Sequence, residues 1–429
     1  MSLVAKFVKS QESVAREEYF LDNHVHILSQ NSLTETPNEQ TNLCGENLRE
    51  YEEYFRDITN RNNIIDEILK HGRATTVDGT LINFHQNFVL KSPNPENLPK
   101  IGAKAKIRHE AFVGLRCMNK LREQGVYNFV WTHFFHTKNG KPYLLLENIR
   151  GETLKSSFAK LTHDELTSIC NQLYCALTMA HEQFGFTHYD LHFLNILLVK
   201  ASDVPFHLKY HINGEDVFVA SPGILAVIID YEASYVEVDG MGHGAPLSVN
   251  SWDVTEKINR YTDRSFSQSD IYRFMFSISH SIIDATRFLS LWLAPHIEEE
   301  LRKTGLTIND YIASRYAFIP DTPELRKITP LEMFQELGML LGLSVSHFEY
   351  NVASYLQCQN ETITVVRNPY SSPFIDKVDK FVQYVLSQRE ELNTFVIGDA
   401  LDTLRQRTQD PREKMIVRKL AKALIEDVN

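Results

Sequence analysis

The sequence predicts an α+β protein with two lobes, a small antiparallel sheet followed by a larger and mainly helical part. Residues 64–147 contain short apolar or alternating runs that are separated by turn signals, as in antiparallel sheets. From residue 151 onward, apolar residues recur at helical spacing over long segments. The chain has 429 residues, which is long enough for two or three packed units.

The first 60 residues are predicted to form an extension, helical in part and disordered in part, because charged and small polar residues dominate them. Residues 61–149 are predicted to form the small lobe. Its strands are expected at 80–84, 87–91, 129–136 and 143–146. The last two strands flank Asn139-Gly140, a typical hairpin turn, so they are expected to pair.

One helix interrupts the predicted sheet between residues 104 and 124, and Gly125 is its expected end. Residues 150–429 are predicted to form the helical lobe with extra helices at its C-terminal end. Thr162 and Glu165 form a capping-box pattern at the start of its first long helix.

Composition limits the possible partners. There are 44 Lys and Arg residues against 55 Asp and Glu residues, which gives a formal charge of −11. Nucleic-acid binding through a broad surface needs many clustered cations, so no nucleic-acid partner is expected. Hydrophobic residues make up 43% and charged residues 23%, a balance that excludes a wholly disordered chain.

The cysteines and the apolar segments indicate the cellular compartment in which the protein is expected. The five cysteines are scattered and form no Cys-x-x-Cys pair, which favours a reducing compartment such as the cytoplasm. The most apolar long window, residues 275–297, is interrupted by His280, Asp284 and Arg287. It therefore predicts a buried helix and no membrane span.

The strongest chemical signal is the run from His188 to Leu198, a polar cluster between a helix and an apolar strand. Asp190 and Asn195 lie five positions apart on the expected loop, and Asp230 follows the apolar run 224–229. Phosphoryl transfer needs a carboxylate that orients the acceptor and oxygen ligands for Mg²⁺. These three residues suit those roles.

The pattern His-x-Asp-x-x-x-x-Asn, followed by an apolar strand and Asp230-Tyr231-Glu232, resembles the catalytic loop and metal motif of the protein-kinase-like fold. The predicted fold class is therefore α+β, a bilobal protein-kinase-like fold. The resemblance implies a strand lysine and a helical glutamate upstream. Lys91 in Phe-Val-Leu-Lys and Glu110, nineteen residues later, match these two in spacing.

The resemblance implies a site for ATP with Mg²⁺ or Mn²⁺, in which Asn195 and Asp230 hold the metal and Asp190 is the catalytic acid–base residue. Residues 69–77 lie where the family has its glycine-rich phosphate loop, although only Gly72 remains of three glycines. Glu147 and Ile149 lie where the adenine-binding hinge is expected. The implied nucleotide-binding residues are Leu69, Gly72, Val77, Val89, Lys91, Glu147, Ile149 and Leu197.

Several positions depart from the family pattern. Tyr189 replaces the arginine that reads a phosphorylated activation loop, and no Ala-Pro-Glu follows before residue 270, so activation by loop phosphorylation is not expected. His192 and Glu232 replace a lysine and a glycine, as in choline and aminoglycoside kinases. A neutral-pH histidine is only partly charged, so a cationic role for His192 predicts turnover that falls as the pH rises.

Between Asn195 and Asp230 the chain carries an insertion with a predicted hairpin at 207–219, which turns at Asn213-Gly214. With this insertion, the chain looks most similar to the divergent serine/threonine protein kinases of large DNA viruses. That resemblance implies transfer of the γ-phosphate of ATP to a protein hydroxyl, in a host cytoplasm or a virion.

Three alternatives stay open. The chain could be a small-molecule kinase or a nucleotide-binding pseudokinase scaffold, and His188 with His192 could instead be two zinc ligands, although no third ligand is evident. The acceptor protein and the oligomeric state are not indicated by the sequence.

Overall fold

A computed structural model of the chain describes residues 16–17, 20–21, 48–74, 79–84, 88–93, 103–201, 206–245, 264–279, 292–305, 307–308, 319 and 322–340. The chain divides into two compact units. The first comprises Met1–Leu154, Ala176–Ala201 and Leu225–Ser267, and the second comprises Lys155–Cys175, Ser202–Ile224 and Gln268–Asn429.

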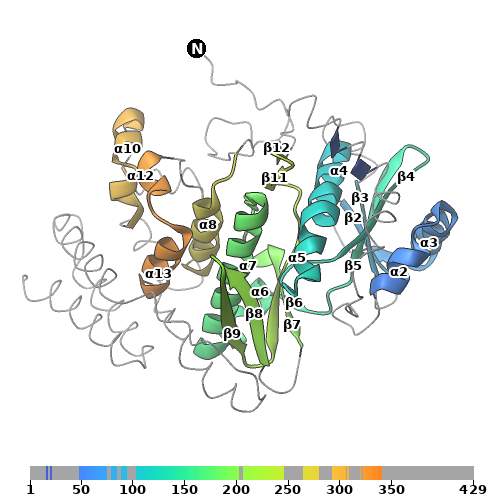
Figure 1. Ribbon diagram of the computed structural model, residues 1–429, viewed down its shortest axis with the longest axis horizontal. Coiled ribbons are helices and arrows are strands. Elements are labelled where there is room, and N and C mark those ends of the chain that lie inside the picture. Colours follow the sequence, from blue (N-terminus) through green and yellow to red (C-terminus); the bar gives the residue numbers. More distant parts are fainter. Residues whose placement is uncertain are drawn as a thin grey trace, which may run out of the picture. The chain divides into compact units, whose positions relative to one another are not determined.

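The first unit contains most of the strands (Figure 1). Its elements before residue 155 are α2 (Leu48–Tyr54), α3 (Ile58–His71), β1 (Arg73–Ala74), β2 (Gly79–Phe84), β3 (Phe88–Pro93), α4 (Ala103–Val113), the π-helical turn η2 (Gly114–Met118), α5 (Asn119–Glu123), β4 (Thr132–Lys138), β5 (Lys141–Glu147) and β6 (Glu152–Thr153). Further along the chain it contains η4 (Phe193–Asn195), β7 (Ile196–Lys200), β10 (Ile224–Ile228), β11 (Tyr235–Val238) and β12 (Met241–Gly244).

Five strands form an antiparallel sheet in the order β1-β2-β3-β5-β4. Strands β2 to β5 lie where the sequence predicted them, within a few residues, whereas β1 was not predicted. Asn139 and Gly140 have φ angles of 51° and 72°, as the two central residues of a type I′ turn require. The sequence prediction of the β4–β5 hairpin is confirmed.

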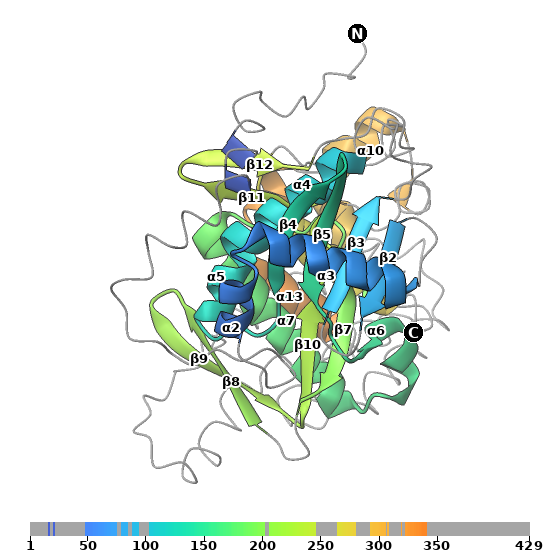
Figure 2. The same ribbon diagram turned by 90° about the vertical axis from the view of Figure 1, so that its right-hand side faces the viewer.

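Helices α3 and α4 lie on opposite faces of this sheet (Figures 1 and 2). One face packs with α2 and α3 in a single apolar cluster that contains Phe55, Ile65, Ile68, Ile82, Phe88, Leu90, Phe134, Tyr143 and Leu145. Because side chains alternate along a strand, Lys91 points to the other face, where α4 lies. The boundary expected at residue 60 falls inside α3, and Phe55 with the partly buried Tyr51, both before that boundary, packs in this cluster.

The helix predicted over 104–124 is present as α4, η2 and α5 in sequence, and Gly125 follows it with a φ of 87°. The side chain of Asn119 pairs with the backbone of Thr132 in both directions, at 2.7 and 2.9 Å. Thr132 lies at a bulge in β4, so Asn119 completes the hydrogen bonding that the bulge interrupts. These bonds fix the helix against the sheet.

Two smaller sheets complete the first unit. One has the strand order β10-β7-β6, and the other is the β11–β12 hairpin. An isolated parallel bridge joins Phe129 to Ile228, with Val130 N–H donating to Ile228 C=O at 3.1 Å. The end of β10 is thereby held beside the segment that leads into β4.

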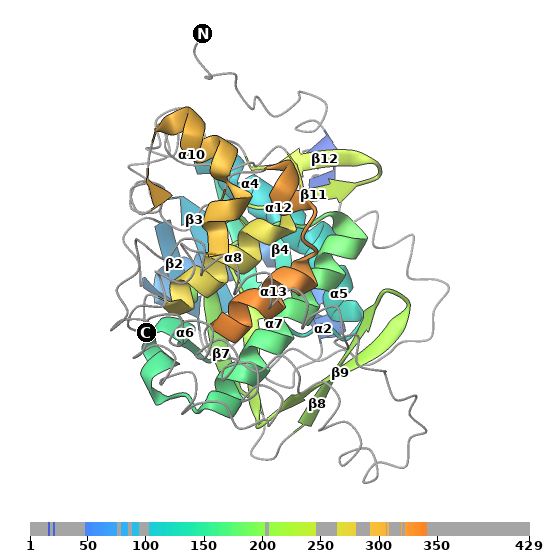
Figure 3. The same cartoon turned by 90° about the vertical axis from the view of Figure 1, so that its left-hand side faces the viewer.

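The second unit includes α6 from residue 155 (Leu154–Ser157), the short helix η3 (Phe158–Lys160), the β8–β9 hairpin (Phe206–Ile212 and Glu215–Ser221) and a group of helices (Figure 3). Those helices are α8 (Ser267–Ser279), η6 (Ala294–His296), α10 (Glu298–Thr304), α12 (Pro323–Arg326) and α13 (Pro330–Leu340). Asn213 and Gly214 have φ angles of 52° and 80°, so the predicted hairpin turn is confirmed.

Helix α7 (His163–Phe184) contributes residues to both units. The predicted capping box is present, since Thr162 N–H donates to the Glu165 carboxylate at 2.8 Å and Glu165 N–H donates to Thr162 Oγ1 at 3.3 Å. None of the helices in the described ranges combines the length and the hydropathy needed to cross a bilayer.

Candidate active site

Lys91 and Glu110 are brought together by the sheet and helix α4. Lys91 lies on β3, and its Nζ is 2.7 Å from Glu110 Oε2 on α4. The predicted pair of strand lysine and helical glutamate is therefore present as an ion pair, with side-chain exposures of 15% and 2%.

Asp230 is the third member of this group. It follows β10, and its Oδ1 lies 2.8 Å from Lys91 Nζ. Its backbone φ is 69°, an uncommon left-handed conformation for a residue other than glycine. One ammonium group therefore contacts two carboxylates that lie 120 positions apart, on α4 and after β10.

The surroundings move the pKa values of these three groups in different directions. Burial alone would lower the pKa of Lys91, but the carboxylates of Asp230, Glu110 and Glu232 raise it well above its ordinary value. Burial would raise the pKa of Asp230, but Lys91 holds it below its ordinary value. For the more deeply buried Glu110, burial outweighs Lys91 and raises the pKa. The carboxylates around Lys91 therefore keep its side chain charged.

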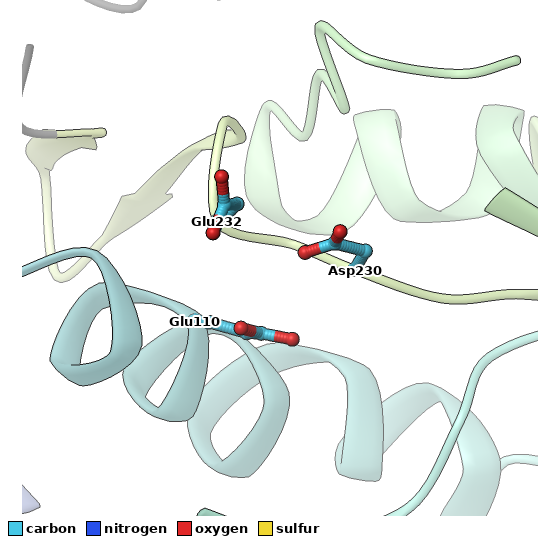
Figure 4. Close-up of side chains that lie close together, drawn as sticks. All are labelled: Glu110, Asp230 and Glu232. Carbon is cyan, nitrogen blue, oxygen red and sulfur yellow. The ribbon is translucent and has the colours of Figure 1, made fainter. Parts of the chain in front are cut away.

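Glu232 extends the group toward the start of α4. Its Oε1 lies 3.1 Å from Nζ of Lys106, one helical turn before Glu110. Carboxylate oxygens of Glu110, Asp230 and Glu232 lie within 4.8 Å of one another (Figure 4). The sequence analysis did not predict Lys106 as a site residue. Its position four residues before Glu110 could have indicated it, because this spacing places both side chains on one face of the helix.

His188 connects the predicted catalytic loop to the segment that carries Asp230. Its Nε2 donates to the carbonyl oxygen of Ile229 at 3.0 Å, and its Nδ1 accepts from Asp190 N–H at 3.2 Å. Such a ring is neutral, and burial lowers its pKa. Both ring nitrogens of His188 are engaged in these bonds, so neither nitrogen has a lone pair directed at a metal ion. The arrangement does not support the interpretation of His188 as a zinc ligand.

Asp190 and Asn195 lie on the same loop. Asn195 Nδ2 donates to Asp190 C=O at 2.9 Å, and Asn195 C=O accepts from Ile229 N–H at 3.0 Å. The amide nitrogen of Asn195 is thereby engaged, so its Oδ1 is the atom suited to bind a hard cation such as Mg²⁺. Asp230 offers carboxylate oxygens, which are also ligands that Mg²⁺ prefers.

His192 lies beside Asp190, with 3.8 Å between Nε2 and Asp190 Oδ2. Its Nδ1 accepts from Leu194 N–H at 3.2 Å and caps the turn η4. A protonated Nδ1 could not accept this bond, so the geometry is that of a neutral ring. The sequence predicted a partly cationic His192, and the capping bond opposes that charge.

Tyr189 and Tyr231 flank the polar residues of the site. Tyr189 is buried with a φ of 59°, and its hydroxyl donates to Arg264 C=O at 2.7 Å. Tyr231 is also buried, and its hydroxyl donates to Ile228 C=O at 3.1 Å. Its ring centroid lies 6.2 Å from that of His188. Both rings therefore pack the backbone that carries Asp190 and Asp230.

The predicted hinge residues lie at and after the end of β5. The Glu147 side chain is buried and accepts from Arg122 at 2.9 Å, and Arg122 also donates to Phe129 C=O at 2.7 Å. Ile149 is buried, while Val89 on β3 and Leu197 on β7 are half-buried. The sequence did not predict the Arg122–Glu147 pair.

The predicted phosphate loop differs from the structure at its start. Leu69 lies in the last turn of α3 and is 43% exposed, and Gly72 ends that helix with extended backbone angles, φ −74° and ψ 159°. The 3.6-residue apolar periodicity of α3 extends to Ile68, which is why the chain is helical here. Leu69 and Gly72 therefore belong to a helix end. Val77 lies outside the described residues.

No family model matches the chain. It is 26% identical to the serine/threonine-protein kinase haspin of Bos taurus over 251 residues, 54% of this chain and 31% of that protein. It is 29% identical to haspin of Mus musculus over 197 residues, 42% of this chain and 25% of that protein. The chain thus spans less than a third of the length of these relatives.

Viral proteins also resemble the chain. It is 28% identical over 221 residues to the uncharacterized protein 179R of Invertebrate iridescent virus 6, covering 47% of this chain and 18% of that protein. The solved kinase PK-1 of Cydia pomonella granulovirus aligns with 42% of this chain and 57% of its own, at 14% identity and a TM-score of 0.25.

Proposed function

The chain has a divergent protein-kinase-like fold, and from this premise we propose that it is a serine/threonine protein kinase that transfers the γ-phosphoryl group of ATP to a protein hydroxyl. The observation that carries the proposal is the contact of Lys91 with both Glu110 and Asp230, at 2.7 and 2.8 Å. In kinases such a lysine binds the α- and β-phosphates and such an aspartate binds the metal.

Lys91 is prepared to bind phosphate. Its charge is fixed by the neighbouring carboxylates, and Glu110 holds its position from α4. A positioned, permanently charged donor makes a strong hydrogen bond to a phosphate oxygen at little cost in side-chain entropy. The binding of ATP would draw Lys91 toward the phosphates and leave Asp230 for the metal.

Asn195 and Asp230 would hold Mg²⁺ or Mn²⁺, because they offer an amide oxygen and a carboxylate on adjoining segments of backbone. The metal supplies positive charge where negative charge develops on the phosphoryl oxygens. Asp190 accepts a hydrogen bond from the acceptor hydroxyl. That oxygen then attacks the γ-phosphorus, the bond to the ADP oxygen breaks, and the hydroxyl proton passes to Asp190.

The adenine base would bind at the end of β5, next to Glu147. The Glu147 carbonyl oxygen and the Ile149 N–H would form its two hydrogen bonds, with Val89 and Leu197 packing on the ring faces. The buried Arg122–Glu147 pair supports this role, since it fixes the end of β5.

The test is transfer of radiolabelled γ-phosphate from ATP to generic acidic and basic proteins, with Mg²⁺ or Mn²⁺. Asp190→Ala and Lys91→Ala should each reduce transfer to background, and Asp190→Ala should do so with an unfolding temperature close to that of the wild type. Lys209→Ala, at an exposed residue of the β8–β9 hairpin, is the matched lysine control and should keep full activity. Retained activity in Asp190→Ala would contradict the proposal.

A nucleotide-binding scaffold without catalysis is the second candidate, because Gly72 ends a helix where a kinase has its phosphate loop. Nucleotide protection in a thermal shift, without transfer to any protein, would favour this candidate. Transfer to a choline- or aminoglycoside-type acceptor, and to no protein, would instead indicate a small-molecule kinase.

A further inference from the structure

A buried carboxylate lies between two buried histidines at a place that the proposed chemistry does not use. Oε1 of Glu17 is 3.3 Å from Nδ1 of His109 and 3.2 Å from Nδ1 of His243. All three side chains are at most 3% exposed. Glu17 precedes the small lobe, His109 is on α4, and His243 is on β12, so the group joins three distant segments of the first unit.

The hydrogen bonds determine how this group holds its charge. Nε2 of His109 is 2.8 Å from the carbonyl oxygen of Ser234, which can only accept, so Nε2 carries a hydrogen. With Glu17 ionised, Nδ1 of His109 also donates, and the ring is then a cation paired with the carboxylate. A buried charge pair of this kind holds its geometry firmly, because separating it would leave a buried charge without compensation.

His109 connects the group of Glu17, His109 and His243 to the candidate active site. His109 directly precedes Glu110, the residue that contacts Lys91. Through Ser234, it also contacts the segment that begins at Asp230, since Ser234 Oγ donates to Tyr231 C=O at 2.7 Å. Helix α4 is therefore joined to the segment 230–234 at two points. Lys91 contacts both Glu110 and Asp230, and His109 contacts the carbonyl oxygen of Ser234.

Aromatic contacts reinforce the same attachment. The Phe20 ring packs edge-on against Phe112, with centroids 5.5 Å apart, and the Phe112 and His243 rings lie 4.7 Å apart. The guanidinium of Arg116 lies 5.7 Å from the Phe20 ring centroid. Residues 109, 112 and 116 share one face of the helix, so Glu17 and Phe20 dock along that face.

We propose that Glu17, His109 and His243 form a latch by which the N-terminal segment positions α4, and thereby Glu110, for nucleotide binding. The inference rests on the proposed function, because it assigns these residues as positioning residues of the same site. Activity would then depend on contacts supplied by the chain's own N-terminal segment, and on no phosphorylated loop.

The first test compares Glu17→Ala, Glu17→Gln and the neighbouring control Arg16→Ala, whose side chain is exposed, in the full chain. Glu17→Ala should lower kcat/KM for ATP about tenfold. Glu17→Gln should lower kcat/KM by a similar factor, because a neutral amide cannot balance the charge of the His109 ring, and Arg16→Ala should match the wild type. Equal kcat/KM in Glu17→Ala and the wild type would overturn the proposal.

The second test asks whether Glu17 acts through Glu110. If it does, Glu17→Gln in a Glu110→Gln background should cause no further loss beyond Glu110→Gln alone, because residues that act in series are not additive. Losses that multiply would show that Glu17 acts on folding in general, and would overturn the proposal. The Gln substitutions are nearly isosteric, so this test does not depend on the folding of Glu17→Ala.

A measurement independent of transfer separates the latch from the proposed function. Glu17→Ala should raise amide hydrogen exchange in Ala103–Val113, whereas Arg16→Ala should not. An inactive wild type would contradict the proposed function but leave this readout in place. Unchanged exchange in α4 of Glu17→Ala would contradict the latch even if the wild type is an active kinase.

Discussion

Nε2 of His188 lies 3.0 Å from the carbonyl oxygen of Ile229, so a single neutral imidazole joins the loop of Asp190 to the strand end of Asp230. The backbone N–H of Asp190 donates to the other ring nitrogen at 3.2 Å. The relative position of Asp190, the proposed catalytic residue, and Asp230, the proposed metal ligand, is thus fixed through one ring that touches neither carboxylate in these bonds.

The stability of the protein should depend on pH through His188. Burial holds the pKa of His188 below its ordinary value of about 6.5, so below that pH the unfolded chain binds a proton that the folded ring does not. This contribution is fully present at higher pH and is lost as the pH falls below about 6.5, at up to about 1.4 kcal/mol per pH unit. Urea unfolding of the wild type and His188→Gln between pH 8 and 5 should show their difference shrinking on acidification.

Ile58→Ala is the control for that experiment, because this residue is 62% exposed and its side chain does not titrate. The unfolding free energy of this variant should change with pH in parallel with that of the wild type. Parallel pH dependence for His188→Gln as well would mean that His188 binds its proton equally well in the folded and the unfolded protein.

The Lys106–Glu232 pair should matter more for catalysis than for stability. Both side chains are about one-third exposed, and exposed pairs contribute at most about 1 kcal/mol to folding. Lys106→Met should therefore leave the urea midpoint nearly unchanged but lower kcat/KM roughly fivefold, since α4 loses a contact with the metal-binding segment.

The exposed pair Lys209–Asp216, at 2.7 Å, provides the matched control. Lys209→Met should change neither quantity. A large loss of stability in Lys106→Met would show that this pair is structural.

The Arg122–Glu147 pair should behave in the opposite way. Its side chains are 1% and 0% exposed, so Arg122→Met removes the cation from a buried carboxylate and should cost about 3–5 kcal/mol of unfolding free energy. The double variant Arg122→Met/Glu147→Met should recover part of that loss. Denaturant unfolding of the two single variants and the double variant measures it, and additive losses would contradict the pairing.

His192 should act as a neutral hydrogen-bond donor. Because its Nδ1 caps η4, protonation would cost that bond, so we expect turnover not to fall between pH 6 and 8, unlike the cationic role that the sequence suggested. His192→Asn should keep the cap, whose loss costs about 1 kcal/mol, yet lose the Nε2 donor beside Asp190. A rate that declines steadily over this range in the wild type, but not in His192→Lys, would restore the cationic role.

Much of the site could be predicted because its residues occur in local patterns. The spacing of Asp190 and Asn195 reflects one short loop, and the two Asn-Gly turns were predictable because few residues accept their positive φ angles. Lys91 and Glu110 followed once the loop was identified, and the structure brings their side chains together.

The missed features depend on contacts between distant segments. No local pattern links Glu17 to His243 or Arg122 to Glu147, since each pair forms only when the chain has folded. Leu69 was expected at the start of a phosphate loop because of its spacing from Lys91 and the single glycine at position 72, whereas the apolar spacing of Ile65 and Ile68 continues the helix to His71.

The left-handed backbone at Tyr189 and Asp230, with φ angles of 59° and 69°, carries a cost in stability. Such conformations cost about 1–3 kcal/mol each in residues other than glycine, and here they occur at both segments that His188 joins. At Tyr189, the buried ring and its hydroxyl bond to Arg264 C=O offset this cost. At Asp230, asparagine accepts a left-handed backbone equally well but lacks the charge that pairs with Lys91. Laboratory evolution that selects for turnover should therefore retain aspartate at position 230.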